Sequence, residues 1–404
     1  MMYEHFDNTV KGIKDKLSQD PSGINARKKY VLELSRLGRK LYTKNETIAW
    51  CGVTAPFDLL SSMGVTSCFV EFVGAMLAST QTAGFFFEDA EDAGFATDSC
   101  AYHRAVMGAV LKNAMPEPDF IIGTSSPCTA GLAVMENFAN QYKKDFFILN
   151  VPQNYSKDAI RFLSNQIEEL THFVSAHTKE PLSKEKLGMA LENFNQSSKL
   201  LRDIYDLAKT KPSPVDNRLL RDFGVVMTLL MGTREGIDIC QAFKDELNQR
   251  IKTSRHHASK EKTRLMWIQN RIQYPFPMDK MLDDLGAKIV IDELNTVTWE
   301  PMDPDNPFES IAKRMISIPF SMDTSKRIKN MQTLALDYQI DGAINPCHWG
   351  CRQGTGARGL VSKGMRDIDI PVLNLEIDCV DSRNLARGQI ETRVEAFMEM
   401  LSNG

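Results

Sequence analysis

Phe120-Ile121-Ile122-Gly123-Thr124-Ser125-Ser126-Pro127-Cys128 is the stretch of sequence that decides the fold. A short apolar run that ends in a polar, proline-containing turn is typical of a strand buried in a parallel sheet. Helical stretches are predicted after two of the strands, at 102–112 and 130–142. This alternation predicts a doubly wound sheet. Runs of the same kind occur at Thr47-Ile48-Ala49-Trp50, Ser67-Cys68-Phe69-Val70 and Phe146-Phe147-Ile148-Leu149.

The same pattern returns near the end of the chain. Apolar runs at 288–291, 342–344 and 372–375 indicate further buried strands. Between the two α/β segments, apolar residues step by three and four from Leu187 to Ala208, which predicts one long helix. We therefore expect an α/β protein with two doubly wound, flavodoxin- or Rossmann-like parallel-sheet domains. The expected order is an N-terminal helical segment (1–45), the first α/β domain (46–160), a helical region (161–275) and the second α/β domain (276–404).

Composition excludes several classes of partner. The chain has 404 residues, of which 43% are hydrophobic and 25% charged, and a formal net charge of −4. These values are typical of a soluble globular protein with more than one domain. The charge is not gathered into basic clusters, so neither a nucleic acid nor a membrane is expected as a partner. The N-terminus lacks the apolar core of a secretory signal, which predicts a cytoplasmic protein.

The eight cysteines are the main functional clue. In a reducing compartment they are better candidates for metal ligands than for disulfides. Ligands of open α/β sheets bind beyond the carboxyl ends of the strands. Cys68 and Cys240 fall on apolar faces and are expected to be core thiols. The other six are predicted at the functional rim: Cys51, Cys100, Cys128, Cys347, Cys351 and Cys379.

The spacing of these six cysteines favours an iron–sulfur cluster over zinc. Structural zinc usually takes closely spaced pairs of ligands from one loop, and here only Cys347 and Cys351 are close. Cubane clusters accept thiolates from distant turns. Glycines crowd the loop after Cys351 and allow backbone N–H groups to approach anionic sulfur. Each single cysteine remains as compatible with a buried small side chain as with a ligand.

At these positions the chain resembles the 2-hydroxyacyl-CoA dehydratase and benzoyl-CoA reductase family. The resemblance extends over nearly the whole chain from about Thr47, and the order of its motifs is more specific than any one of them. The matching motifs are Trp50 through Pro56-Phe57-Asp58-Leu59, Asp98-Ser99-Cys100-Ala101-Tyr102-His103-Arg104, Cys128, Pro212-Ser213-Pro214, Cys351-Arg352 and Gln389-Ile390-Glu391-Thr392-Arg393.

The resemblance implies which cysteines bind a cluster. In the family, three cysteines per subunit hold one [4Fe–4S] cluster and leave the fourth iron for substrate or solvent; the matching positions are Cys100, Cys128 and Cys351. This chain departs from that pattern by adding Cys51, Cys347 and Cys379 at predicted rim loops. Six thiolates are enough for two cubanes, as in the family's double-cubane cluster proteins with an [8Fe–9S] unit.

The double-cubane resemblance implies an oxidoreductase. It would be a homodimer that reduces small molecules such as acetylene, azide or hydrazine. A separate ATP-hydrolysing iron–sulfur reductase would act as activator and supply low-potential electrons. An anionic cluster is costly to reduce, which fits an ATP-driven donor. The chain has no P-loop pattern, so we expect nucleotide to bind the partner.

Three polar residues near the predicted rim are candidate catalytic residues. His103 and His348 could deliver protons to a reduced substrate, although a hydrogen bond to cluster sulfur or to a backbone carbonyl is the more common role. Arg352, like Arg104, could offset cluster charge or bind an anion. An arginine at such a place more often pairs with a carboxylate, here Asp98 or Asp381.

Two other functions remain open. The chain could be a dehydratase, hence a lyase, or an aryl-CoA reductase subunit with one [4Fe–4S] cluster and a sister subunit. It could also be a non-enzymatic electron-transfer protein. About eight irons per subunit would indicate the double cubane, and about four a single cluster.

Overall fold

A computed structural model of the chain describes residues 2–20, 25–253 and 261–403. It contains two four-stranded parallel sheets flanked by helices, as expected. The first sheet has the strand order β2-β1-β3-β4 and the second β6-β5-β7-β8, so the two sheets repeat one topology. The strands are β1 (Thr47–Cys51), β2 (Val65–Phe69), β3 (Phe120–Thr124), β4 (Asp145–Leu149), β5 (Thr263–Trp267), β6 (Ala287–Asp292), β7 (Gly342–His348) and β8 (Val372–Ile377).

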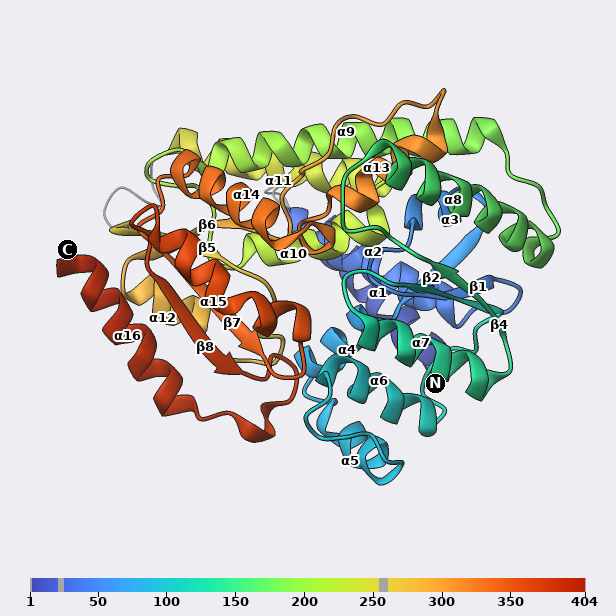
Figure 1. Ribbon diagram of the computed structural model, residues 1–404, viewed down its shortest axis with the longest axis horizontal. Helices are drawn as coiled ribbons and strands as arrows, with labels where there is room; N and C mark the ends of the chain where they lie inside the picture. Colours follow the sequence, from blue (N-terminus) through green and yellow to red (C-terminus); the bar gives the residue numbers. More distant parts are fainter. Residues whose placement is uncertain (1, 21–24, 254–260, 404) are drawn as a thin grey trace.

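The two sheets occupy separate lobes, which are joined by long helices. Figure 1 shows the second sheet in the left lobe and the first sheet in the right lobe, with α9 (Lys184–Ala208) running across the top of both. Helix α9 is the long helix expected from the three- and four-residue steps, and its apolar face is buried from Leu187 to Ala208. It packs on α11 (Arg234–Thr253).

The remaining helices cover the sheets and form the N-terminal segment. Those of the N-terminal half are α1 (Met2–Ser18), α2 (Ala26–Leu41), α3 (Phe57–Ser62), α4 (Val70–Ser79), α5 (Gly84–Asp92), α6 (Ala101–Leu111), α7 (Thr129–Tyr142) and α8 (Lys157–Thr178). The later ones are α10 (Leu219–Val225), a π-helical turn at Val226–Leu230, α12 (Met278–Asp284), α13 (Pro307–Ser317), a 3₁₀ turn at Pro319–Ser321, α14 (Thr324–Asp337), α15 (Arg352–Arg366), a 3₁₀ turn at Ser382–Asn384 and α16 (Arg387–Asn403).

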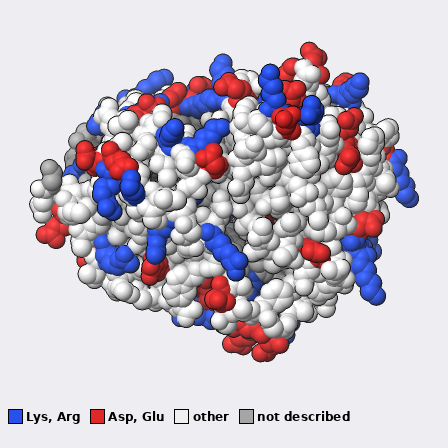
Figure 2. Space-filling view, in the orientation of Figure 1, with Lys and Arg blue, Asp and Glu red and all other residues white. Residues whose placement is uncertain are grey.

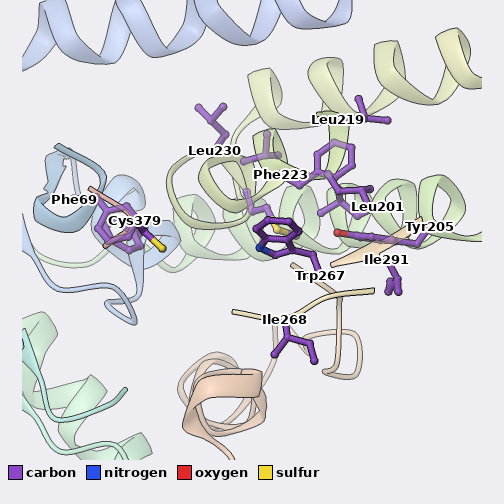
Figure 3. Packing of buried hydrophobic residues seen from close by; sticks show 14 of the residues in the cluster. Phe69, Leu201, Tyr205, Leu219, Phe223, Leu230, Trp267, Ile268, Ile291 and Cys379 are labelled. Atoms are coloured by element: carbon purple, nitrogen blue, oxygen red, sulfur yellow. The ribbon is translucent and has the colours of Figure 1, made fainter. Parts of the chain in front are cut away.

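One large buried cluster connects the two lobes. It includes side chains of the first sheet such as Phe69, of α9 such as Tyr205, and of the second domain such as Trp267 and Cys379. Part of this cluster is drawn in Figure 3. Cys68 and Cys240 are buried core thiols, as predicted, because each lies on the apolar face of its strand or helix.

Two details differ from the expectations. Strand β7 runs to His348, so Cys347 lies inside a strand and not in the loop after it. Pro346 is tolerated there because β7 pairs with β5 only up to Ile344 and continues against β8 alone, as an edge strand does. The second sheet also starts before residue 276, because β5 lies within the range expected to be helical.

The surface carries charges of both signs. In the view of Figure 2 they are interspersed along the periphery, and the middle of this face is mostly uncharged. None of the helices among the described residues is long and apolar enough to cross a membrane.

Candidate functional site

Three of the six predicted cysteines open onto one cavity between the two domains. The cavity has a volume of about 1540 Å³ and is lined by Cys100, Cys128 and Cys351, and also by the core thiol Cys68. Each of these residues is the N-cap of a helix: Cys100 of α6, Cys128 of α7 and Cys351 of α15. The N-terminal end of a helix carries partial positive charge and favours a thiolate. Three such ends therefore meet where an anionic group can bind.

Cys128 and Cys351 occupy equivalent places in the two domains. Each follows the third strand of its sheet in chain order, β3 or β7, and each is followed three residues later by a glycine. The Cys128 Sγ accepts a hydrogen bond from the Gly131 N–H at 3.2 Å, and the Cys351 Sγ accepts one from the Gly354 N–H at 3.4 Å. These donors stabilise the charged form of sulfur, which a metal ligand requires.

Cys100 has the most polar surroundings of the three. Its Sγ lies 3.5 Å from the His348 Nε2, across the domain boundary. Burial would raise the pKa of the Cys100 thiol, but His103 and His348 outweigh burial and hold this pKa well below its usual value. Burial raises the pKa of Cys128, and it raises that of Cys351 to about 11 with the help of the neighbouring Cys100. The surroundings of Cys100 thus favour the thiolate more than those of Cys128 and Cys351 do.

The backbone of the second domain contacts the Cys100 loop directly. Gly350 has a φ of +75°, and a Cβ added there would lie 2.5 Å from the Cys100 nitrogen. One helical turn along α6, Arg104 donates a hydrogen bond to Asp381 at 3.2 Å and also one to Glu91. Of the alternatives considered for Arg104, the structure shows pairing with Asp381, and this pair joins the two domains next to the cysteines.

The other three predicted cysteines are buried and are not among the cavity-lining residues that the structure describes. Cys51 is the last residue of β1 and lies beside Ser67, and burial raises its thiol pKa. Cys347 contacts the Asn345 carbonyl and the Asn374 side chain, and burial raises its pKa although Arg358 is close. Cys379 follows β8, is fully buried in the core and has a strongly raised pKa for the same reason.

Both predicted histidines face the cysteine cavity, but the predicted arginine does not. The His103 Nε2 lies 3.3 Å from the Glu71 Oε1. Burial disfavours charged His103, but the Cys100 thiolate and the Glu71 carboxylate outweigh burial, so the pKa of His103 lies well above its usual value. Arg352 is exposed on the first turn of α15 and is not among the described lining residues.

Sequence reasoning missed two polar residues of this cavity. Glu71 follows β2 on the first turn of α4, and its second carboxylate oxygen is buried without a hydrogen-bond partner. Asn270 follows β5, and its side chain hydrogen-bonds Cys351. Both lie just beyond strand ends, which is the signal that could have identified them.

The donor set fits a cluster better than a single ion. No group of three or more His, Cys, Asp or Glu side chains within the described part of the chain is arranged around one metal ion. Cubane thiolates ligate different irons and stand farther apart than the ligands of one ion. The three thiols line one cavity from both domains, each at a helix N-terminus, which is compatible with ligands to different irons.

Comparison with known proteins identifies the family. Residues 52–401 match the family model described as 2-hydroxyglutaryl-CoA dehydratase, D-component. The chain belongs to this family. All six predicted cysteines except Cys51 lie within the matched residues.

Curated relatives of the family cover most of the chain. The (R)-phenyllactyl-CoA dehydratase alpha subunit of Clostridium sporogenes is 23% identical over 374 residues, 89% of this chain and 90% of that protein. The lactoyl-CoA dehydratase alpha subunit of Anaerotignum propionicum is 22% identical, with 90% and 92% covered. A benzoyl-CoA reductase subunit of Thauera aromatica is 23% identical, with 79% and 80% covered. These relatives are subunits of enzymes, so this family member is an enzyme component.

Proposed function

We propose that the chain is the cluster-binding subunit of a 2-hydroxyacyl-CoA dehydratase or an aryl-CoA reductase, with one [4Fe–4S] cluster on Cys100, Cys128 and Cys351. The observation that carries this proposal is the opening of these three thiols, and of no other predicted ligand, onto one interdomain cavity. The subunit names of the relatives support a sister subunit, and the need for low-potential electrons supports an ATP-hydrolysing reductase as activator.

The surroundings of the cysteines fit the group. The Gly131 and Gly354 N–H groups donate to sulfur, and helix N-termini face the site from both domains. When bound, the cluster supplies a single low-potential electron to the substrate. The chain's own residues hold the thiolates, exclude water and provide His103 and Glu71 at the cavity wall as groups that can exchange a proton.

A single cluster is favoured over a double cubane by the burial of the additional cysteines. Cys51, Cys347 and Cys379 are each 1% exposed or less and none of them lines the cavity that Cys100, Cys128 and Cys351 share. To bind a second cubane in that cavity they would have to move out of their packed positions. Reduction of acetylene, azide or hydrazine by an [8Fe–9S] homodimer is therefore the second candidate.

Iron analysis separates the two candidates. The chain is loaded anaerobically with iron and sulfide and its iron is counted. We expect about four irons per chain, because one cubane is bound. Replacing Cys51, Cys347 and Cys379 together by alanine should leave the count unchanged, and Cys351→Ser should remove most of the iron. A count of about eight that falls to about four in the triple variant would contradict the proposal and favour the double cubane.

A further inference from the structure

His348 contacts Cys100 across the domain boundary. Among the described residues, no other histidine of the second domain contacts Cys100. The residue ends β7 in the second domain and is 1% exposed. Its ring is held edge-on by Tyr102 of the first domain, with ring centres 5.3 Å apart and planes at 86°. The ring therefore has one orientation, with Nε2 directed at the Cys100 Sγ at 3.5 Å.

The backbone determines which nitrogen of His348 carries the proton. The Nδ1 accepts a hydrogen bond from the Cys379 backbone N–H at 3.0 Å. A backbone amide can only donate, so Nδ1 has no proton and the neutral ring carries its proton on Nε2. Asp378 does not compete, because its Oδ1 lies 3.6 Å from Nδ1 and already accepts from the Val380 and Asp381 N–H groups at 2.8 and 2.7 Å.

We propose that His348 is a positioning residue that donates a fixed hydrogen bond from Nε2–H to the Cys100 sulfur and so sets the reduction potential of the bound cluster. Adding an electron makes the sulfur ligands more negative, and a donor to sulfur stabilises the reduced form. His348 thereby raises the potential. It does not deliver a proton to substrate, since its second nitrogen is an acceptor for backbone. This inference rests on the proposed cluster at Cys100.

The same hydrogen bond links the potential to the domain arrangement. Cys379 and His348 belong to the second domain, whereas Cys100 caps a helix of the first. Gly350 allows the two backbones to meet beside this contact, because any side chain there would overlap with Ser99 and Cys100. The donor is present only while the domains remain packed together.

The tautomer is tested first and needs no cluster. The chain has seven histidines, which are labelled with ¹⁵N. An NMR spectrum is recorded of the iron-free chain and of the chain loaded anaerobically with an oxidised cluster. The His348 signals are assigned by their loss in His348→Gln. We expect an unprotonated Nδ1 and a protonated Nε2 in both samples. A proton on Nδ1 in either sample would overturn the proposal whether or not a cluster binds.

The potential is then measured by an EPR-monitored redox titration of the loaded protein. His348→Met fills the space without a donor and should lower the potential, while His348→Gln, whose amide can donate, should restore part of the loss. Tyr102→Phe is the matched control, because it keeps the ring against His348 and should leave the potential unchanged.

Equal potentials in wild type and His348→Met would refute the role. If His348→Met does not load, wild type is compared with His348→Gln, whose weaker donor should leave a smaller fall in potential, and an equal potential would refute the role. A chain that binds no iron at all would refute the proposed function instead.

Discussion

At the scale of single residues, glycine decides how closely the two domains approach at the cysteines. Gly350 has a positive φ, which L side chains rarely adopt, and its Cα faces the Ser99–Cys100 backbone. Its neighbour on α15, Gly356, has an ordinary φ and no atom within 4 Å of an added Cβ. The two glycines therefore serve different purposes, although both lie near Cys351.

Gly350→Ala should weaken cluster binding. The new Cβ would overlap with the Cys100 backbone, and the left-handed conformation adds about 1–2 kcal/mol of strain. The Cys100 loop must then move away from Cys351, so we expect iron content to fall several-fold and the melting temperature to decrease. Gly356→Ala is the matched control: it should keep all the iron and stabilise the helix by up to ~1 kcal/mol. Full iron loading in Gly350→Ala would contradict the assigned contact.

The residue pattern located the cysteines, but only the family resemblance, and not their placement, divided them into two groups. Five of the six were predicted from their places near strand ends and Cys100 from the start of a helix, and all six lie at the last residues of a strand, beyond its end or at a helix N-cap. Side chains alternate across a sheet, so a position at a strand end does not say whether a thiol faces the cavity or the core. Cys128 and Cys351 each accept an N–H from the glycine three residues later, but Cys347 is also followed by a glycine at that spacing, Gly350, so the spacing alone does not separate the groups.

At the scale of elements, buried ion pairs hold short helices to the body of the protein. Arg314 on α13 donates to both oxygens of Asp58 on α3, at 2.6 and 2.8 Å, and its guanidinium also lies over the Phe194 ring of α9. Both partners are buried and both line the interdomain cavity. The pair thus positions one wall of the candidate site.

Asp58→Asn should destabilise the protein strongly. Removing one charge leaves Arg314 buried without its counter-ion, which costs about 3–5 kcal/mol. The free energy of unfolding from urea titration measures this loss. Glu309→Gln on the same helix is the control, because the Glu309–Lys313 pair is about half exposed and such pairs contribute about 0–1 kcal/mol. Similar effects of the two substitutions would argue against a structural role for the buried pair.

Helix and strand alternation was predictable, but β5 was not. Its sequence, Thr263-Arg264-Leu265-Met266-Trp267, contains a charge that interrupts the apolar run. Arg264 is nevertheless buried, because its guanidinium donates to the carbonyls of Ala208 and Lys209 at the C-terminal end of α9 and to Glu261. A cation at that end of a helix is favourable. Only the tertiary structure brings this helix end to the strand, so the sequence pattern alone could not reveal it.

At the scale of the whole molecule, a charged network keeps the two domains in contact beside the cysteines. Arg104 of the first domain is 2% exposed and lies between Glu91 on α5 and Asp381 after β8. Arg383 also donates hydrogen bonds to both of these carboxylates. Burial would raise the pKa of Asp381, but Arg383 and Arg104 outweigh burial and hold it below its usual value. The network requires an ionised Asp381.

This lowered pKa makes the domain contact sensitive to acid. A carboxyl group whose pKa is lower in the folded than in the unfolded state stabilises the folded protein. Its contribution to the unfolding free energy is full at pH values above the unfolded-state pKa of about 4. The contribution is lost as the pH falls below that value toward the folded pKa. The difference in unfolding free energy between wild type and Asp381→Asn should therefore be constant from about pH 5 to pH 7 and should narrow below about pH 4.

Urea titrations across this pH range measure the difference, and small-angle scattering at neutral pH reports whether the variant's domains separate. Asp381→Asn should give a larger radius of gyration, since the buried Arg104 loses its counter-ion across the domain boundary. The control is Asp367→Asn, whose exposed pair with Lys363 lies within α15 and its C-cap and spans no boundary. It should change neither the radius nor the stability at any pH. If the Asp381→Asn difference stayed constant down to pH 3, the ionised carboxylate would not be what holds the two domains together beside the candidate site.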